Sequence, residues 1–285
     1  MPLDLSAGLQ SCLAVTERGD VDRPFAGDTA SFYARYRRSY PAEFLTRLQV
    51  FSRSGRGRLL DLGCGTGQLL LQLAPFFDQA VGIDPELDML REAKRIAGEQ
   101  GVDNVEWIRG GSGELQGLES VLGEFDLVTI GTAFHFMDPH ATLSQLQRLA
   151  PQGAVAVAYN GRPMWLHADP WAKAVRSVLE SRLGQLSDAD FTTDALDAAE
   201  VTMRNLGYRQ VQRWEQTAVD KIDLDFIVGH ILSAISTEQV PATQRQTFAH
   251  ELSTAITAIE PSGRVLEEVP VRAVIGRATQ DRASE

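Results

Sequence analysis

The stretch Arg58-Leu59-Leu60-Asp61-Leu62-Gly63-Cys64-Gly65-Thr66-Gly67 decides the fold of this chain. It holds a short run of leucines, and three glycines follow at alternate positions. An apolar run that ends abruptly in glycines is typical of a buried strand entering a tight turn. Residues 68–73 have the apolar face of a helix. The stretch therefore predicts a strand, a glycine loop and a helix, in that order.

The spacing of the glycines narrows the choice of ligand. Glycines let backbone N–H groups approach a ligand closely, and the N–H groups at the start of the following helix point at the same place. A dinucleotide-binding loop has the spacing G-x-G-x-x-G, but here Gln68 stands where the third glycine would be. The chain also lacks the Gly-Lys-Ser/Thr of a phosphate-binding P-loop. The alternative is a structural turn that binds nothing.

The loop sequence Asp-Leu-Gly-Cys-Gly-Thr-Gly resembles the first motif of the class I S-adenosylmethionine (SAM) methyltransferases. The acid, the small residue and the three glycines all fall in register with that motif. The resemblance implies that SAM is the cofactor. It also implies that the loop contacts SAM through Asp61, Gly63, Cys64, Gly65 and Gly67.

Length and composition set the broad class. The chain has 285 residues, which suits one large domain or one domain with a cap. The net charge of −11 argues against nucleic acid as a partner, because a phosphate-binding surface needs clustered Lys and Arg. No run is long and apolar enough for a membrane span, and no secretory signal is evident. Only Cys12 and Cys64 occur, so we expect no disulfide and a cytoplasmic protein. The oligomeric state stays open, a homo-oligomer included.

A second apolar run, Gln79–Asp84, ends in a carboxylate. A carboxylate at the end of the second parallel strand can accept hydrogen bonds from both hydroxyls of a ribose. The alternative is that Asp84 caps the helix expected over residues 85–99. The resemblance implies further cofactor contacts from Pro85 and from Met89, the latter against adenine, although Met on a helix also fills cores.

Strands and helices then alternate along the chain. Further strands are expected at residues 105–109, 125–131, 154–159, 208–219 and 265–278. Such alternation implies a mostly parallel sheet with helices on both faces. The predicted fold class is α/β, a doubly wound, mostly parallel, seven-stranded Rossmann-like methyltransferase sheet with a helical lid.

Two loops should complete the cofactor site. In the family, the loop after the third strand contacts adenine, here through Ser112 and Gly113; Gly113 stands where an acid is common, so the group that holds the adenine amine stays open. The loop after the fourth strand, Thr132-Ala133-Phe134-His135-Phe136-Met137-Asp138-Pro139, resembles that of small-molecule methyltransferases. The resemblance assigns Thr132 and Phe134 to the cofactor. His135 is the candidate catalytic base, with a structural imidazole as the alternative.

Residues 29–41 resemble the N-terminal "Tyr…Tyr-Arg-Pro…Tyr-Pro" segment of one small-molecule methyltransferase group. In that group the segment folds over the cofactor. By resemblance Tyr33 and Arg37 line the pocket, and Arg37 pairs with the methionine carboxylate. The match departs at Arg38, where the group has proline. The alternative is a surface helix with snorkelling arginines.

We predict four regions: cofactor-covering helices at 1–52, a SAM-binding core at 53–160, a lid insert at 161–207, and the end of the sheet at 208–285 with a second lid insert at about 222–262. The inserts are rich in aromatic and apolar residues, as a small-molecule pocket requires. His167 and His230 are assigned to lid packing or the surface. No metal site is expected, because the five histidines have no paired spacing.

These observations predict a SAM-dependent methyltransferase that moves a methyl group to an N or O atom of a small molecule, of the secondary-metabolite type, by in-line displacement. The identity of the acceptor is not encoded in the lid sequence. The alternative is a non-catalytic SAM-binding sensor or scaffold protein, which would keep the glycine loop and Asp84 but lack an acceptor cavity. A nicotinamide dehydrogenase would need the missing third glycine.

Overall fold

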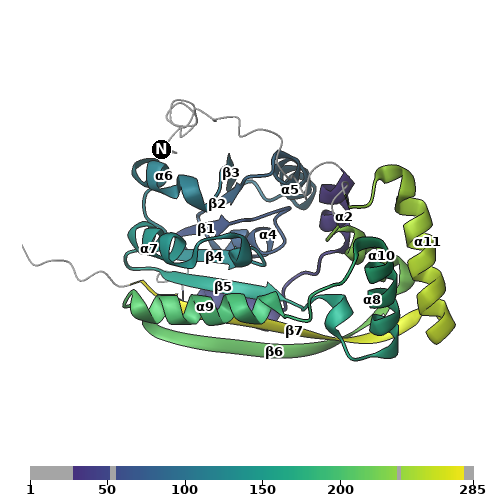
Figure 1. Cartoon of the computed structure of the whole chain (residues 1–285). Coiled ribbons are helices and arrows are strands. Elements are labelled where there is room, and N and C mark those ends of the chain that lie inside the picture. Colours follow the sequence, from purple (N-terminus) through teal and green to yellow (C-terminus); the bar gives the residue numbers. More distant parts are fainter. Residues whose placement is uncertain (1–27, 52–55, 236–238, 279–285) are drawn as a thin grey trace, which may run out of the picture.

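The computed structural model of the protein describes residues 28–51, 56–235 and 239–278. Most of the predicted N-terminal region 1–52, and Cys12 with it, lies outside the described residues. Figure 1 shows a central sheet covered by helices on both faces and, at one end of it, a group of helices carried by the two longest strands.

The seven strands form one sheet in the order β3-β2-β1-β4-β5-β7-β6. Only β7 runs antiparallel to its two neighbours, β5 and β6, and the remaining pairs are parallel. This confirms the predicted doubly wound, mostly parallel sheet. The strands are β1 (Arg58–Leu62), β2 (Gln79–Asp84), β3 (Val105–Arg109), β4 (Leu127–Gly131), β5 (Ala154–Asn160), β6 (Arg209–Asp223) and β7 (Arg264–Arg277).

The alternation of small and large side chains along β5 shows how the two faces of the sheet differ. Its alanines pack on the face covered by α3 (Ala42–Phe51), and its Val and Tyr side chains pack on the face covered by α6 (Leu115–Leu122) and α7 (Pro139–Leu149). Because successive residues of a strand point to opposite faces, β5 is buried on both. The small alanines give α3 room to bring Phe44 and Leu48 down onto the sheet.

The helix after the glycine loop is shorter than predicted. The sequence indicated a helix from residue 68, but α4 covers only Leu70–Leu73 and continues as the 3-10 turn η1 (Ala74–Phe76). Pro75 lies in that turn and has no N–H to extend an α-helix. The next helix, α5 (Leu87–Gln100), follows β2 as expected.

The long strands β6 and β7 extend beyond β5 as a two-stranded ribbon. Their pairing runs on from Thr217↔Pro270 to Asp223↔Arg264, whereas β5 ends opposite Val271. Because β6 is parallel to β5, this extension lies on the carboxyl side of the parallel strands. It carries the helices that we term the lobe: α8 (Pro170–Leu183), α10 (Leu224–Leu232) and α11 (Ala242–Ile259). The lobe has its own apolar core, which includes Trp171, Ile231, Phe248 and Leu252.

The predicted lid insert at 161–207 divides into two parts. Its first helix, α8, belongs to the lobe, but α9 (Phe191–Asn205) packs on the sheet beside α7 (Figure 1). Leu196, Ala199 and Met203 of α9 lie in the core beneath the sheet. The prediction that all of 161–207 forms a lid is therefore corrected, because the apolar face of α9 covers β5 and β7.

Helix α2 (Asp28–Tyr36) lies between the core and the lobe (Figure 1) and contacts both α5 and α10. We term residues 28–41 the strap. Among the described helices, none is both long and apolar enough to cross a bilayer.

Candidate functional site

The glycine loop is held against the ends of two neighbouring strands. Gly63 has φ +72°, and a Cβ built on it would lie 2.6 Å from Cβ of Ala133 in the loop after β4. The N–H groups of Gly63 and Cys64 both donate to the carbonyl oxygen of Ile83 on β2, at 2.8 and 3.0 Å. Position 63 therefore needs glycine, because both the backbone conformation and the close approach exclude a side chain.

Asp84 lies against this loop, where the sequence placed it. Its Oδ2 accepts a hydrogen bond from the N–H of Gly65 at 2.8 Å, and Oδ1 accepts one from the N–H of Glu86 at 2.8 Å. The carboxylate is buried, and burial raises its pKa to about 6, although the two backbone hydrogen bonds oppose the rise. Asp84 thus faces the glycine loop with one oxygen and the residue before α5 with the other, while its predicted role with a ribose stays a prediction.

A second buried carboxylate forms the floor of the site. Asp61 is 1% exposed, and its Oδ1 accepts a hydrogen bond from Thr129 Oγ1 on β4 at 2.7 Å. Burial raises the pKa of Asp61 to about 7, and the nearby charge of Asp84 adds to the rise. Two carboxylates that titrate near neutrality therefore lie on adjacent strands beneath the glycine loop.

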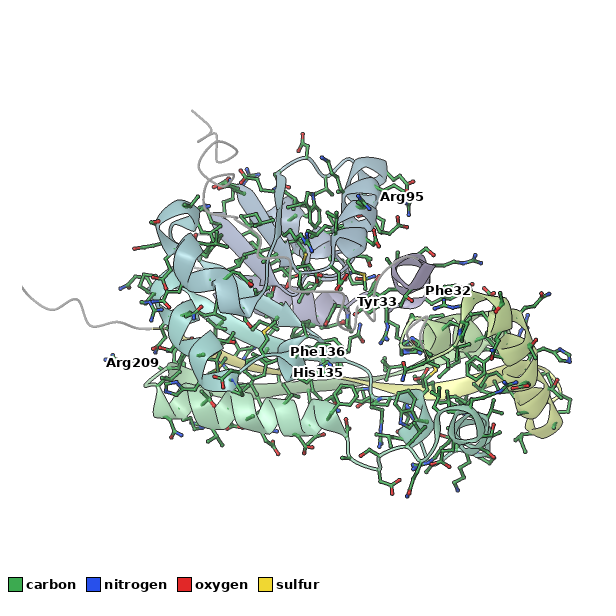
Figure 2. All side chains as sticks on the ribbon, turned by 45° about the horizontal axis from the view of Figure 1, so that its top comes forward. Phe32, Tyr33, Arg95, His135, Phe136 and Arg209 are labelled. Atoms are coloured by element: carbon green, nitrogen blue, oxygen red, sulfur yellow. The ribbon has the colours of Figure 1, made fainter. Side chains whose placement is uncertain are left out.

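The strap brings Tyr33 and Arg37 to the opposite side of the loop. A Cβ on Gly65 would lie 3.7 Å from Cε1 of Tyr33, so the tyrosine ring covers the loop. The Arg37 guanidinium carbon lies 4.7 Å from the centre of that ring, and Arg37 Nε donates to Ser233 Oγ at 2.9 Å. Figure 2 shows Tyr33 on the core side of α2 and Phe32 on the lobe side. The surface-helix alternative therefore fails for Arg37, although it describes the exposed Arg35.

These groups surround a small cavity with a free volume of about 30 Å³. Six of the predicted cofactor residues line it: Tyr33, Arg37, Asp61, Gly63, Cys64 and Thr132. Sequence reasoning missed the other lining residues, which are Arg38, Tyr40, Gln68, Leu69, Gly131, Asn160 and His230. Tyr40 and Gln68 could have been found, since Tyr40 lies within the recognised segment 29–41 and Gln68 directly follows the glycine loop. His230 was assigned to lid packing or the surface; it is buried on α10 in the lobe, as lid packing requires, and it also lines the cavity.

The predicted adenine contacts lie outside this cavity, at the ends of β2 and β3. Met89 is 3% exposed on α5, and Pro85 is exposed. Ser112 begins the 3-10 turn η2 (Ser112–Glu114), and Gly113 follows it at the surface. Glu114 Oε2 accepts the N–H of Gly111 at 2.8 Å, so this carboxylate caps the turn. The adenine roles of these residues, like the contact predicted for Gly67, stay predictions.

Phe134 does not face the cavity. Its side chain is 1% exposed and packs in the core with Leu143 and Tyr159. The contact predicted between Phe134 and the cofactor therefore stays a prediction, and in this structure the side chain belongs to the core. An apolar ring at this point in the loop gains more by joining the core beneath β4 and β5 than by lining a polar cleft.

His135 is held by aromatic rings and one phenol. Its ring centre lies 3.9 Å from that of Phe136 and 4.6 Å from that of Phe191. Figure 2 shows His135 and Phe136 together at the end of the core nearer the lobe. Tyr159 Oη accepts the backbone N–H of His135 at 3.1 Å and lies 3.0 Å from Nδ1 of the same residue.

That phenol sets the tautomer of His135. We assign the Tyr159 O–H as the donor to Nδ1, because the same oxygen accepts the backbone N–H of His135, and this assignment places the ring proton on Nε2. Burial lowers the pKa of His135 to about 4, and the positive charge of Arg37 contributes. His135 is therefore neutral at physiological pH, and its outward nitrogen is a hydrogen-bond donor. This arrangement disfavours the predicted role as a base at Nε2.

Among the residues that the structure describes, no group of three or more His, Cys, Asp or Glu side chains could hold a metal ion. Cys64 is a free, buried thiol, and burial raises its pKa well above the usual value. The side chains that line the cavity carry carboxylate, guanidinium, hydroxyl, amide, thiol and imidazole groups.

Residues 59–153, from β1 to the turn before β5, match the family model described as "Methyltransferase domain". They form a class I SAM-dependent methyltransferase domain. The matched range of this domain contains the glycine loop, both buried carboxylates and His135, whereas the strap and the lobe lie outside it.

The chain is also similar in sequence to known proteins. A probable SAM-dependent methyltransferase of Saccharomyces cerevisiae is 28% identical over 145 residues, which is 50% of this chain and 46% of the yeast protein. The chain spans about half the length of the curated relatives it matches.

Solved structures share the fold over most of the chain. A putative type II methyltransferase from Anaeromyxobacter dehalogenans superposes with a TM-score of 0.58 and 20% identity, over 86% of this chain and 100% of that one. A SAM-dependent methyltransferase from Thiobacillus denitrificans, solved with S-adenosylhomocysteine, gives a TM-score of 0.50 and 20% identity, over 91% and 100% of the two chains. At this level of identity the likeness concerns the fold alone.

Proposed function

We propose that the chain is a SAM-dependent methyltransferase that moves a methyl group to an N or O atom of a small molecule, of the secondary-metabolite type. One observation carries the proposal: the glycine loop and the strap residues Tyr33 and Arg37 line one cavity, and the buried Asp84 is hydrogen-bonded to the same loop. The three parts come from separate regions of the chain, and each suits a different part of the same cofactor.

The side chains of the cleft fit SAM. Asp84 is a buried carboxylate at the tip of β2, where it can accept hydrogen bonds from two ribose hydroxyls. Arg37 presents a guanidinium that can hold the methionine carboxylate through charge-assisted hydrogen bonds. Gly63 and Gly65 leave room for close approach because neither has a side chain. When bound, SAM supplies a methyl group that is already activated by the sulfonium.

The chain then has to align the acceptor with the methyl carbon and exclude water. Alignment of this kind contributes about 7–11 kcal/mol to lowering a barrier. The position and composition of the lobe favour a small molecule as the acceptor. The lobe lies on the carboxyl side of the sheet, and its interior is apolar with a few buried polar groups. The net charge of −11 disfavours a nucleic acid in that place.

Calorimetry with S-adenosylhomocysteine tests the cofactor assignment. We expect binding by the whole chain, and Asp84→Ala should weaken it at least tenfold, since the ribose loses both acceptors. An exposed aspartate, Asp103, provides the matched control: Asp103→Ala should bind as the parent does. Binding of NADH in place of S-adenosylhomocysteine would overturn the proposal.

Transfer of labelled methyl from SAM into the small-molecule fraction of an extract of the producing cells tests the reaction. We expect labelled product that is soluble in organic solvent or in water but is not retained with protein or nucleic acid. Cofactor binding without any labelled product would favour the non-catalytic sensor or scaffold.

A further inference from the structure

His230 is the lining residue that the lobe contributes to the cleft. It lies on α10, and it lines the same cavity as the glycine loop. The other lining residues come from the strap, from the glycine loop and its helix, and from the ends of β1, β4 and β5. An acceptor held by the lobe would therefore approach the cleft past His230.

The hydrogen bond of His230 determines which of its nitrogens carries the proton. Nδ1 lies 3.1 Å from the carbonyl oxygen of Tyr36. A carbonyl oxygen can only accept, so Nδ1 must donate, and in the neutral ring Nε2 is left with a free lone pair. Burial lowers the pKa of His230 well below the usual value, and the positive charges of Arg37 and Arg38 contribute, so the ring is neutral at physiological pH.

The two histidines near the cleft therefore have opposite tautomers. His135 receives a hydrogen bond at Nδ1 from Tyr159, so its Nε2 carries the proton. His230 donates from Nδ1, so its Nε2 is unprotonated. A base needs a free lone pair. On this criterion His230 is ready to accept a proton from a ligand, and His135 is ready to donate a hydrogen bond.

The same contacts that seat His230 also seat Arg37. Ser233 Oγ donates to the carbonyl oxygen of His230 at 2.6 Å and accepts from Arg37 Nε at 2.9 Å. Tyr36, whose carbonyl holds the imidazole, immediately precedes Arg37 in the chain. The imidazole and the guanidinium predicted to hold the methionine carboxylate are thus fixed relative to one another by one short network.

We propose that His230 is the catalytic base of the reaction, taking the proton of the acceptor's N–H or O–H group at Nε2. This proposal rests on the proposed function. The lone pair of the acceptor atom forms the new bond to the methyl carbon while the carbon–sulfur bond breaks, and the breaking pair stays on sulfur. The proton released from the acceptor atom passes to Nε2, and the resulting imidazolium returns it to water. The ring centre of Phe226 lies 5.7 Å from that of His230.

Nuclear magnetic resonance of the ¹⁵N-histidine-labelled whole chain tests the tautomers without any turnover. We expect His230 to show a protonated Nδ1 and an unprotonated Nε2, and His135 to show the reverse. The variants His230→Asn and His135→Asn assign the two sets of signals by deleting them. A His230 ring protonated at Nε2 in the free protein would overturn the proposal.

Turnover tests the role itself, with labelled SAM and the small-molecule fraction of the cell extract as the acceptor source. The amide of His230→Asn can still donate to the Tyr36 carbonyl, but it has no basic nitrogen at the position of Nε2. We expect turnover to fall by about 10²–10⁴, which is the usual size of a base contribution. The affinity for S-adenosylhomocysteine should stay within about twofold of the parent value. The control His140→Asn, at an exposed position of α7, should keep full turnover.

The outcomes separate the two proposals. Full turnover by His230→Asn overturns the role of His230 and leaves the methyltransferase assignment intact. Loss of S-adenosylhomocysteine affinity in His230→Asn, in parallel with lost turnover, shows that the residue positions Arg37 and is not the base. A parent protein that binds no S-adenosylhomocysteine contradicts the proposed function, whatever the tautomer of His230. If His230→Asn fails to fold, the tautomer of His230 in the parent protein still tests the proposal that Nε2 accepts the proton.

Discussion

A Cβ built on Gly229 of α10 would lie 2.3 Å from Cδ2 of Tyr36 on α2. The two helices therefore touch at a point that has no room for a side chain. Around this contact Tyr36 Oη lies 3.1 Å from both carboxylate oxygens of Asp225, and the Tyr36 carbonyl accepts from His230. The strap is thus attached to the lobe as well as to the core, and the orientation of Tyr33 and Arg37 depends on α10.

Gly229→Ala should weaken cofactor binding from a distance. The new methyl group cannot fit, so α2 must shift, and overpacking of this kind costs about 1–3 kcal/mol. We expect the affinity for S-adenosylhomocysteine, measured by calorimetry, to fall by about fivefold or more. Gly98→Ala is the matched control, because Gly98 is also helical and nothing lies within 4 Å of its Cβ position. Equal affinity in the two variants would show that α10 does not position the strap.

Cofactor affinity should depend on pH through Asp84. Its pKa is raised to about 6, and only the ionised carboxylate offers both oxygens as acceptors. Protonation below pH 6 should therefore weaken binding, by about tenfold at pH 5 relative to pH 8. Calorimetry with S-adenosylhomocysteine across this range measures the effect. Asp84→Asn should bind weakly but with a flatter pH profile, and an unchanged slope in that variant would assign the titration to another group.

The strands and the loops at their carboxyl ends could be predicted because local sequence patterns encode them. An apolar run before glycines, or before a carboxylate, marks the end of a parallel strand, and Asp84 and Gly63 lie where such patterns put them. Phe134 and Met89 could not be placed in this way, since an apolar side chain beside a ligand and one in the core look alike in sequence. His230 could not be predicted for a different reason: α10 and the residue after it meet the strap through contacts between residues 35–38 and 225–233, nearly 200 positions apart.

Stability should depend on pH through Asp61. Its folded pKa of about 7 lies above the value of about 3.9 expected in the unfolded chain. Between these values the folded state holds a proton that the unfolded state releases, so the free energy of unfolding falls as pH rises from about 4 to 7. Each unit of pKa difference corresponds to about 1.4 kcal/mol.

Asp61→Asn should remove this pH dependence of the free energy of unfolding, because the amide does not ionise. The amide oxygen can still accept the hydrogen bond from Thr129 Oγ1. Urea unfolding at pH 5 and pH 8 measures the difference. We expect the variant to gain stability relative to the parent on going to pH 8. Asp103→Asn, at an exposed site, should follow the parent at both pH values. A parallel pH dependence of Asp61→Asn and the parent would contradict the assignment.

Tyr159→Phe should free Nδ1 of His135 from its hydrogen bond and thereby raise the pKa of the imidazole. The phenol accepts the backbone N–H of His135 and donates to Nδ1, so its loss frees Nδ1 to bind a proton. We expect the pKa of His135, measured by NMR titration, to rise above its present value of about 4. The unpaired backbone N–H should cost about 1–3 kcal/mol of stability. Tyr208→Phe is the control: it removes another buried hydroxyl, which donates to the Leu143 carbonyl, and it should leave the His135 pKa unchanged.

Arg38 should be essential for stability because it neutralises a buried carboxylate. It is ion-paired with Asp220 at 3.2 Å and with Glu267, two residues that lie opposite one another on β6 and β7. The Glu267 side chain is 1% exposed, and burial raises its pKa to about 7, although Arg38 opposes the rise. Arg38→Met should therefore cost up to about 3–5 kcal/mol at pH 8, because Glu267 must then either stay ionised without the guanidinium or take up a proton, its pKa rising further once Arg38 no longer opposes the rise.

A second substitution, at Glu267, tests whether the buried charge of this residue causes the loss of stability in Arg38→Met. Adding Glu267→Met to Arg38→Met removes the buried charge, and urea unfolding should then show that most of the lost stability is recovered. Lowering the pH to 6 should recover part of it in the single variant, because Glu267 becomes protonated below its raised pKa. Arg95→Met, which breaks an exposed pair with Glu99, should change stability little at either pH. Failure of the double variant to regain stability would mean that Arg38 acts through packing on Phe226, whose ring centre lies 4.7 Å from the guanidinium carbon.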